Sequence, residues 1–285
     1  MGKFRSAQGV VVAVALSMFA ATGCSSGSTA GHDGATDKST GVAEAGTLKI
    51  GTSNNMKPYA YEENGKLTGF EIDLISAAAH KLKLKPQIVA LEFSGLLPAV
   101  NNRQFDVAAA AIGITTPREK MVEFSDGYLA GYFGVLTAPR SGITSDVATV
   151  KGKRIAVLQG SISDTNSGKF LPGANIVRFP DANSADLALK NNRVAGFFSD
   201  FEPNLAIAKK YPALHLKQPI TVPATDFPAG WAARKGNTAL VQKLNGALKQ
   251  LVRDGTWLKL YKKYFPKAPV PTRSELPPYT AKGQP

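Results

Sequence analysis

The sequence predicts an α/β protein of two lobes, each a mainly parallel sheet flanked by helices. Two observations carry this prediction. Short apolar runs typical of buried strands alternate with helical patterns through residues 47–114, and the same alternation starts again after residue 145. A proline-broken segment, 216–231, then reads as a return crossing of the chain. Ligands of such sheets bind beyond the carboxyl ends of the strands.

The N-terminus has the features of an export signal. Lys3 and Arg5 precede an apolar stretch, residues 10–21, that is too short to span a membrane comfortably. Residues 21–24 (ATGC) follow, and residues 1–23 resemble a bacterial lipoprotein signal peptide, with alanine where leucine is usual. This resemblance implies that Cys24 is lipidated and anchors the protein to the cell membrane. An ordinary secretory signal with an incidental cysteine is the alternative, and both readings place the protein outside the cytoplasm.

Composition excludes several classes of protein. The chain has 285 residues, 44% of them apolar, which is enough to bury a sizeable core. A single cysteine rules out an internal disulfide framework, and three scattered histidines lack the spacing of metal ligands, so we expect neither metal nor cofactor. The net charge of +13 becomes 13 − 2 = +11 without Lys3 and Arg5. These charges form no basic run, so we attribute the positive net charge to an exported protein that works at an anionic cell envelope. We expect no nucleic acid as a partner.

The first series of elements follows a flexible tether, residues 24–46, that is rich in Gly, Ser and Thr. Each element is predicted from hydrophobic period and turn residues. In order, we expect a strand from Thr47 in LKIGTS, a turn at Asn64-Gly65, a helix from Gly69 to about Leu82, a strand at 86–91, a short helix at 95–102 and a buried strand at 105–114.

A helix N-terminus follows the last of these strands. Thr116 suits the N-cap, Pro117 suits the first helical position, and Glu119 completes a capping box. Arg118 therefore lies in the first turn, beside unpaired N–H groups and the positive end of the helix dipole. This is a good site for a carboxylate. The alternative is an arginine on a solvated first turn.

The second series repeats the alternation, and two helices end the folded part. We expect strands at 133–137, 154–158, 176–179 and 194–199, a connection at 138–145, a helix capped by Asn183 and running to Lys190, helices at 238–252 and 257–265, and an extended tail, 266–285, with six prolines.

Five motifs in this order resemble the solute-binding proteins of bacterial ABC importers, specifically the amino-acid-binding family, family 3, with the type II periplasmic binding protein fold. Five ordered matches are far more specific than one. They are LTGFEIDL (67–74), FSGLLPAV (93–100), TTPREK with FSDGY (115–120 and 124–128), RIAVLQGS (154–161), and DGT with YKKYF (254–256 and 261–265).

The resemblance implies a lobe 1 of residues 47–136 plus 229–265 and a lobe 2 of residues 137–228, joined by a two-strand hinge. It also implies a monomer that closes on an amino acid and delivers it to the membrane permease of an ABC importer, with no catalytic residue.

The resemblance also implies roles for single residues. Arg118 matches the arginine that grips the ligand carboxylate, and Asp200 matches the acid that takes the ammonium from the opposite lobe. Phe93 matches an aromatic residue against the ligand side chain, and Gly160 and Ser161 match amide or hydroxyl donors. Opposite charges on opposite lobes allow a zwitterion to pull the lobes together.

Four positions depart from the family pattern. Gly113 and Ile162 stand where hydroxyl residues are common, Ser53 where a second acid is common, and Met56 where an aromatic is common. Gly113, Ser53 and Met56 belong to the expected binding residues, and so does Ala111. The changes imply a more apolar pocket that disfavours arginine or histidine and favours a glutamine-like, neutral polar amino acid.

Three alternatives stay open. An amino-acid derivative such as a compatible solute or opine fits if aromatic residues form a cage, although core packing is the simpler reading of these side chains. A dehydratase on the same fold would need an acid in the cleft, from Glu71 or Glu92, and a lipid-anchored sensor is the third option. The candidate cage residues are Phe197, Phe198, Phe201 and Trp231.

Overall fold

The structure is a computed structural model that describes residues 41–280. The expected signal peptide, Cys24 and most of the expected tether lie outside the described residues. Within 41–280, no helix combines the length and the apolar character needed to cross a membrane.

The first of two five-stranded sheets is mixed, with the strand order β5-β1-β6-β13-β7. β1 is parallel to β5 and β6, whereas β13 is antiparallel to β6 and β7. Its strands are β1 (Thr47–Thr52), β5 (Lys85–Ala90), β6 (Val107–Ala108), β7 (Val122–Phe124) and β13 (Ala232–Arg234).

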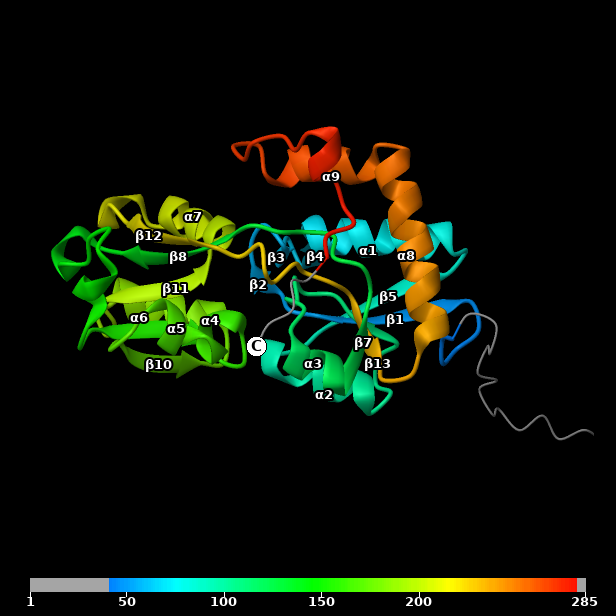
Figure 1. Cartoon of the computed structure of the whole chain (residues 1–285), viewed down its shortest axis with the longest axis horizontal. Helices are drawn as coiled ribbons and strands as arrows, with labels where there is room; N and C mark the ends of the chain where they lie inside the picture. The colour runs from blue at the N-terminus through cyan, green and yellow to red at the C-terminus, as the bar shows by residue number, and fades with distance from the viewer. Residues whose placement is uncertain (1–40, 281–285) are drawn as a thin grey trace, which may run out of the picture. The chain divides into compact units, whose positions relative to one another are not determined.

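Helices cover both faces of this first sheet (Figure 1). One face buries a large core against α1 (Phe70–Lys81), α8 (Thr238–Arg253) and α9 (Thr256–Tyr264). α2 (Leu96–Asn101) packs on the other face, where α3 (Thr116–Met121) also lies. Three shorter strands, β2 (Asn55–Met56), β3 (Ala60–Glu63) and β4 (Lys66–Thr68), form a separate antiparallel sheet.

The second five-stranded sheet has the order β10-β9-β11-β8-β12. β9 is parallel to β10 and β11, and β8 is antiparallel to β11 and β12. The strands are β8 (Tyr132–Thr137), β9 (Arg154–Leu158), β10 (Asn175–Phe179), β11 (Gly196–Asp200) and β12 (Lys217–Pro223). The helices are α4 (Ile162–Thr165), α5 (Ser167–Phe170), α6 (Ala182–Lys190) and α7 (Phe201–Lys210).

Five 3₁₀ turns complete the regular structure of the described residues. They are η1 (Phe93–Gly95), η2 (Pro139–Ser141), η3 (Val147–Val150), η4 (Pro212–Leu214) and η5 (Arg273–Glu275).

Two segments, 125–131 and 224–231, connect the sheets, and they pair with each other. The N–H of Ala229 donates to the carbonyl of Leu129 at 2.7 Å, and the N–H of Tyr128 donates to the carbonyl of Ala229 at 2.8 Å. We call these segments the crossing strands.

Three sequence predictions need correction. The strand expected at 105–114 ends at Ala108, because Ala111 has a left-handed backbone with φ of 49° that breaks the ladder. The cap of α3 is Thr115, whose hydroxyl accepts from the N–H of Arg118, so Thr116 is not the N-cap. Asp181, not Asn183, caps α6 through the N–H of Ser184. The expectation of mainly parallel sheets is confirmed, because four strands of each five-stranded sheet run in one direction and a single strand, β13 or β8, runs in the opposite direction.

The proline-rich segment after α9 is tied to a crossing strand. The N–H of Gly127 donates to the carbonyl of Tyr279 at 3.1 Å, and the N–H of Tyr279 donates back at 2.8 Å. Leu276 packs against the core that also holds α1 and α8.

Candidate functional site

A cavity lies between the two five-stranded sheets, at the ends of their strands and beside the crossing strands. Arg118 and Asp200 are the only charged residues among its lining residues. Its lining residues include Met56, Tyr59, Phe93, Ala111, Gly113, Arg118, Gly131, Phe133, Ser161, Ile162, Ser199, Asp200 and Phe227.

Arg118 is held at the start of α3 with its guanidinium inside the cavity. Its Nη1 donates to the carbonyl of Gly113 at 2.6 Å, and its Nη2 donates to the carbonyl of Gly160 at 2.8 Å. These two carbonyls come from opposite sides of the cavity. The Phe93 ring centroid lies 5.7 Å from the guanidinium carbon. Burial lowers the pKa of Arg118 to about 10, so the side chain stays cationic at neutral pH. A guanidinium has five N–H groups, so donors remain for a carboxylate.

Asp200 supplies the opposite charge from the end of β11. It occupies the N-cap position of α7, yet its side chain makes no capping hydrogen bond, so the carboxylate is not used to hold the helix. Burial raises the pKa of Asp200 to about 7, and the charge of Arg118 partly opposes this shift. A nearby cation therefore stabilises the ionised form of this buried carboxyl group.

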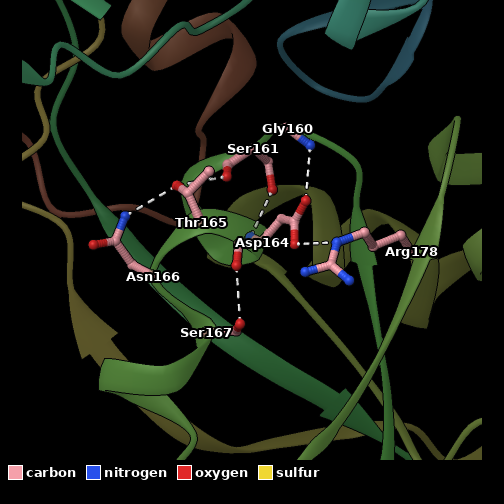
Figure 2. A network of polar contacts seen from close by, with 7 residues as sticks. All are labelled: Gly160, Ser161, Asp164, Thr165, Asn166, Ser167 and Arg178. Carbon is pink, nitrogen blue, oxygen red and sulfur yellow. Dashed lines mark hydrogen bonds and ion pairs between the residues drawn. The ribbon is translucent and has the colours of Figure 1, made fainter. Parts of the chain in front are cut away.

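The loop between β9 and α4 contributes Ser161 to the cavity lining. Figure 2 shows the polar contacts that hold this loop. Asp164 fixes this loop, because its carboxylate accepts from the N–H of Gly160 at 3.0 Å and from Nε of Arg178 at 2.8 Å. The Ser161 hydroxyl oxygen accepts from the N–H of Asp164 at 3.1 Å. The amide of Gly160 is therefore already engaged, and the Ser161 hydroxyl keeps its proton for another acceptor.

Apolar side chains form most of the remaining cavity wall. Phe133 is the second residue of β8, and Phe227 lies in the second crossing strand. Met56 comes from β2, is 8% exposed, and packs into a cluster with Leu136 and Phe197 of the second sheet. This side chain therefore joins the two sides of the cavity.

The four candidate cage residues do not line the cavity. Phe197, Phe198 and Trp231 are fully buried in core clusters, as the simpler reading of the sequence expected. Phe201 lines a separate groove beside α9. The sequence reasoning missed Phe133 and Phe227, although their positions beside the predicted crossings could have indicated them.

Glu71 lies behind the cavity rather than in it. It is fully buried in α1, where its carboxylate accepts from the N–H of Ala111 at 2.8 Å, the hydroxyl of Tyr128 at 2.5 Å and Nε1 of Trp231 at 3.0 Å. Burial raises its pKa, and these three hydrogen bonds oppose the shift. Because Tyr128 and Trp231 belong to the two crossing strands, Glu71 connects both strands to the cavity wall at Ala111.

The structure brings most of the expected binding residues together. Seven of them line the cavity: Met56, Phe93, Ala111, Gly113, Arg118, Ser161 and Asp200. Gly160 reaches it through the carbonyl that accepts from Arg118, and Ser53 is buried outside the lining. Glu92 is exposed and also outside it. Among residues 41–280, no group of three His, Cys, Asp or Glu side chains could hold a metal ion.

Comparison with known proteins identifies the family. The model of bacterial extracellular solute-binding proteins, family 3, matches residues 48–267. The chain belongs to this family. The sequence-based expectation of a family 3 solute-binding protein with the type II fold is thereby confirmed.

Relatives of this family 3 protein are named for different amino acids. A probable histidine-binding protein of Campylobacter jejuni is 29% identical over 218 residues, which cover 76% of this chain and 84% of the relative. An ancestral arginine-binding protein bound to arginine aligns with a TM-score of 0.73 at 35% identity, covering 77% of this chain and 98% of that one. A structure of an ancestral arginine-binding protein bound to glutamine aligns with a TM-score of 0.72, at the same identity and coverage.

Proposed function

We propose that this family 3 solute-binding protein captures a free amino acid with an uncharged, glutamine-like side chain and delivers it to the membrane permease of an ABC importer. The observation that carries the proposal is the pairing of one cation, Arg118, with one carboxylate, Asp200, in a cavity whose other lining residues are uncharged. The carboxylate of the ligand binds Arg118, and its ammonium binds Asp200.

The uncharged remainder of the lining argues for the class of side chain. A cationic ligand side chain would need a second carboxylate, and neither Glu71 nor Glu92 lines the cavity. Burying such a charge without a partner is costly. The names of the relatives include histidine, arginine and glutamine, so they support an amino acid without choosing among these three.

The proposal includes the working arrangement of the protein. Lobe 1 comprises residues 47–136 and 229–265, lobe 2 comprises residues 137–228, and the protein works as a monomer outside the cytoplasm, held at the membrane by lipidated Cys24. It catalyses no reaction: Asp200 is the one acid among the lining residues, and it is assigned to the ligand ammonium. Incubation with prephenate or arogenate should leave these compounds unchanged, and turnover would instead support a dehydratase.

A thermal-shift screen over the amino acids tests the proposal. A ligand at 100 times its Kd stabilises the folded state by about 2.7 kcal/mol, so L-glutamine or a similar amino acid should raise the melting temperature. Arg118→Ala should abolish this shift. Arg253→Ala, which removes an exposed arginine at the end of α8, should retain it. Equal binding by Arg118→Ala and the parent would disprove the carboxylate assignment.

A further inference from the structure

Gly113 and Ile162 meet across the cavity. A Cβ atom built on Gly113 would lie 2.6 Å from Cδ1 and 3.2 Å from Cγ1 of Ile162, and 3.4 Å from the carbonyl oxygen of Phe227. Non-bonded carbon atoms prefer separations of about 3.5–4.0 Å. A side chain at position 113 therefore has no room while Ile162 stays in place.

The requirement for glycine at position 113 is one of space. The φ angle of Gly113 is not positive, so its backbone conformation is open to other residues as well. Gly131 lines the same cavity, and a Cβ built there would meet nothing within 4 Å. The crowding at Gly113 is thus not a general property of cavity glycines.

Ile162 is held firmly in its position. It is 5% exposed and packs into the buried cluster that contains Val157 and Phe198. Its backbone begins α4, directly after the loop that Asp164 ties to Arg178 (Figure 2). Because Ile162 packs into this cluster on one side and lines the cavity on the other, it can move away from an added side chain only by losing that packing or by entering the cavity.

We propose that Gly113 and Ile162 are a matched pair that allows the two lobes to approach and that determines the wall beside Arg118. The isoleucine fills the volume that a side chain at 113 would take, and it presents methyl groups there. Side-chain hydrogen bonds to the ligand carboxylate then come from Arg118 and Ser161. The steric part of this inference stands on the geometry alone, and its consequence for the ligand rests on the proposed function.

A disulfide reporter can measure lobe approach without any ligand. A Cβ built on Gly160 would lie 3.6 Å from Cβ of Ser94. The two Cβ atoms of a disulfide are usually about 3.5–4.5 Å apart. Ser94 belongs to η1 beside the first sheet, and Gly160 follows β9 of the second. Ser94→Cys with Gly160→Cys, in a chain that also carries Cys24→Ser, should therefore cross-link when the lobes approach. The left-handed φ of Gly160 affects all variants of this reporter equally.

Three further variants of the reporter decide the matter. Gly113→Ser should slow cross-linking by about tenfold or more, as expected for overpacking of a buried contact. Adding Ile162→Ala should restore the rate, because it removes the colliding atoms. Gly168→Ser, at a glycine of α5 with nothing within 4 Å of its Cβ, should cross-link like the unsubstituted reporter. Unchanged cross-linking in Gly113→Ser, or no recovery in the double variant, would overturn the pairing.

A ligand titration separates this inference from the proposed function. In the chain without reporter cysteines, Gly113→Ser should weaken binding of L-glutamine by about tenfold, and Ile162→Ala should recover most of the loss. If the parent binds no amino acid, the proposed function fails, and the cross-linking rates still decide the steric pairing. If the parent binds and Gly113→Ser binds equally well, the pairing has no role in recognition and that part of the inference is overturned.

Discussion

Glu71→Gln tests whether the hydrogen bonds behind the cavity outweigh the cost of burying a charge. One carboxylate oxygen of Glu71 accepts from both Ala111 and Tyr128, and the other accepts from Trp231. A glutamine can keep the first two bonds with its carbonyl oxygen. Its NH₂ group must then face the indole N–H of Trp231, so that two buried donors oppose each other.

The expected loss of stability follows from these bonds. Leaving a buried donor unsatisfied costs about 1–3 kcal/mol, and bonds to a neutral acceptor are weaker than bonds to a carboxylate. Removing a buried charge acts in the opposite direction, because burial raises the pKa of Glu71 and so disfavours the ionised form. With three donors on one carboxylate, we expect the bonds to win and the free energy of unfolding to fall by about 2 kcal/mol.

Urea unfolding at pH 7, followed by tryptophan fluorescence, measures this change. Glu62→Gln is the matched control, because Glu62 is exposed on β3, and it should alter the free energy of unfolding by less than about 0.5 kcal/mol. A Glu71→Gln protein as stable as the parent, or more stable, would refute the reasoning. It would mean that the desolvation cost of the carboxylate exceeds the worth of its three hydrogen bonds.

Five further outcomes are expected. Since a ligand ammonium favours ionised Asp200, affinity should fall as pH drops from about 8 to about 6, with proton release on binding in calorimetry, and Asp200→Asn should lose this dependence. The raised pKa of Asp200 should also make the ligand-free protein lose stability as pH rises toward about 7, which thermal melts would detect. Met56→Ala should lower the free energy of unfolding by about 2 kcal/mol in urea, because it empties a buried contact between the lobes. Removal of residues 277–285 should lower the melting temperature by roughly 4 °C, because the hydrogen bonds between Gly127 and Tyr279 are lost. Cys24→Ser should release the protein from membranes in a fractionation assay.

The sequence predicted the surroundings of Arg118 well because local rules govern them. A threonine cap, a proline and a following glutamate indicate a helix start whatever the tertiary structure. The exact cap was wrong by one residue, since Thr115 and Thr116 are chemically equivalent candidates. The early end of β6 was not predictable in the same way, because a left-handed alanine at 111 is held by Glu71, forty positions earlier in the chain.

Long-range contacts explain what the sequence did not reveal about the cavity. Phe133 and Phe227 reach it because the crossing strands bring their positions together, and no local pattern distinguishes them from core phenylalanines. The role of Asp164 was equally hidden, since its carboxylate holds the N–H of Gly160 and thereby removes a donor that the family resemblance had suggested.

Under the proposed function, Arg118 connects recognition of the ligand with the approach of the two lobes. Its guanidinium joins the carbonyl of Gly113 to that of Gly160, which lie on opposite sides of the cavity. A Cβ on Gly113 would collide with Ile162, which lies two residues after the Gly160 carbonyl that accepts from the guanidinium. A carboxylate that binds the remaining N–H groups of Arg118 therefore meets a cation already shared by both lobes. The proposed ligand would bind an arrangement in which the protein itself supplies these contacts across the cavity, so its binding energy would have less conformational change to offset.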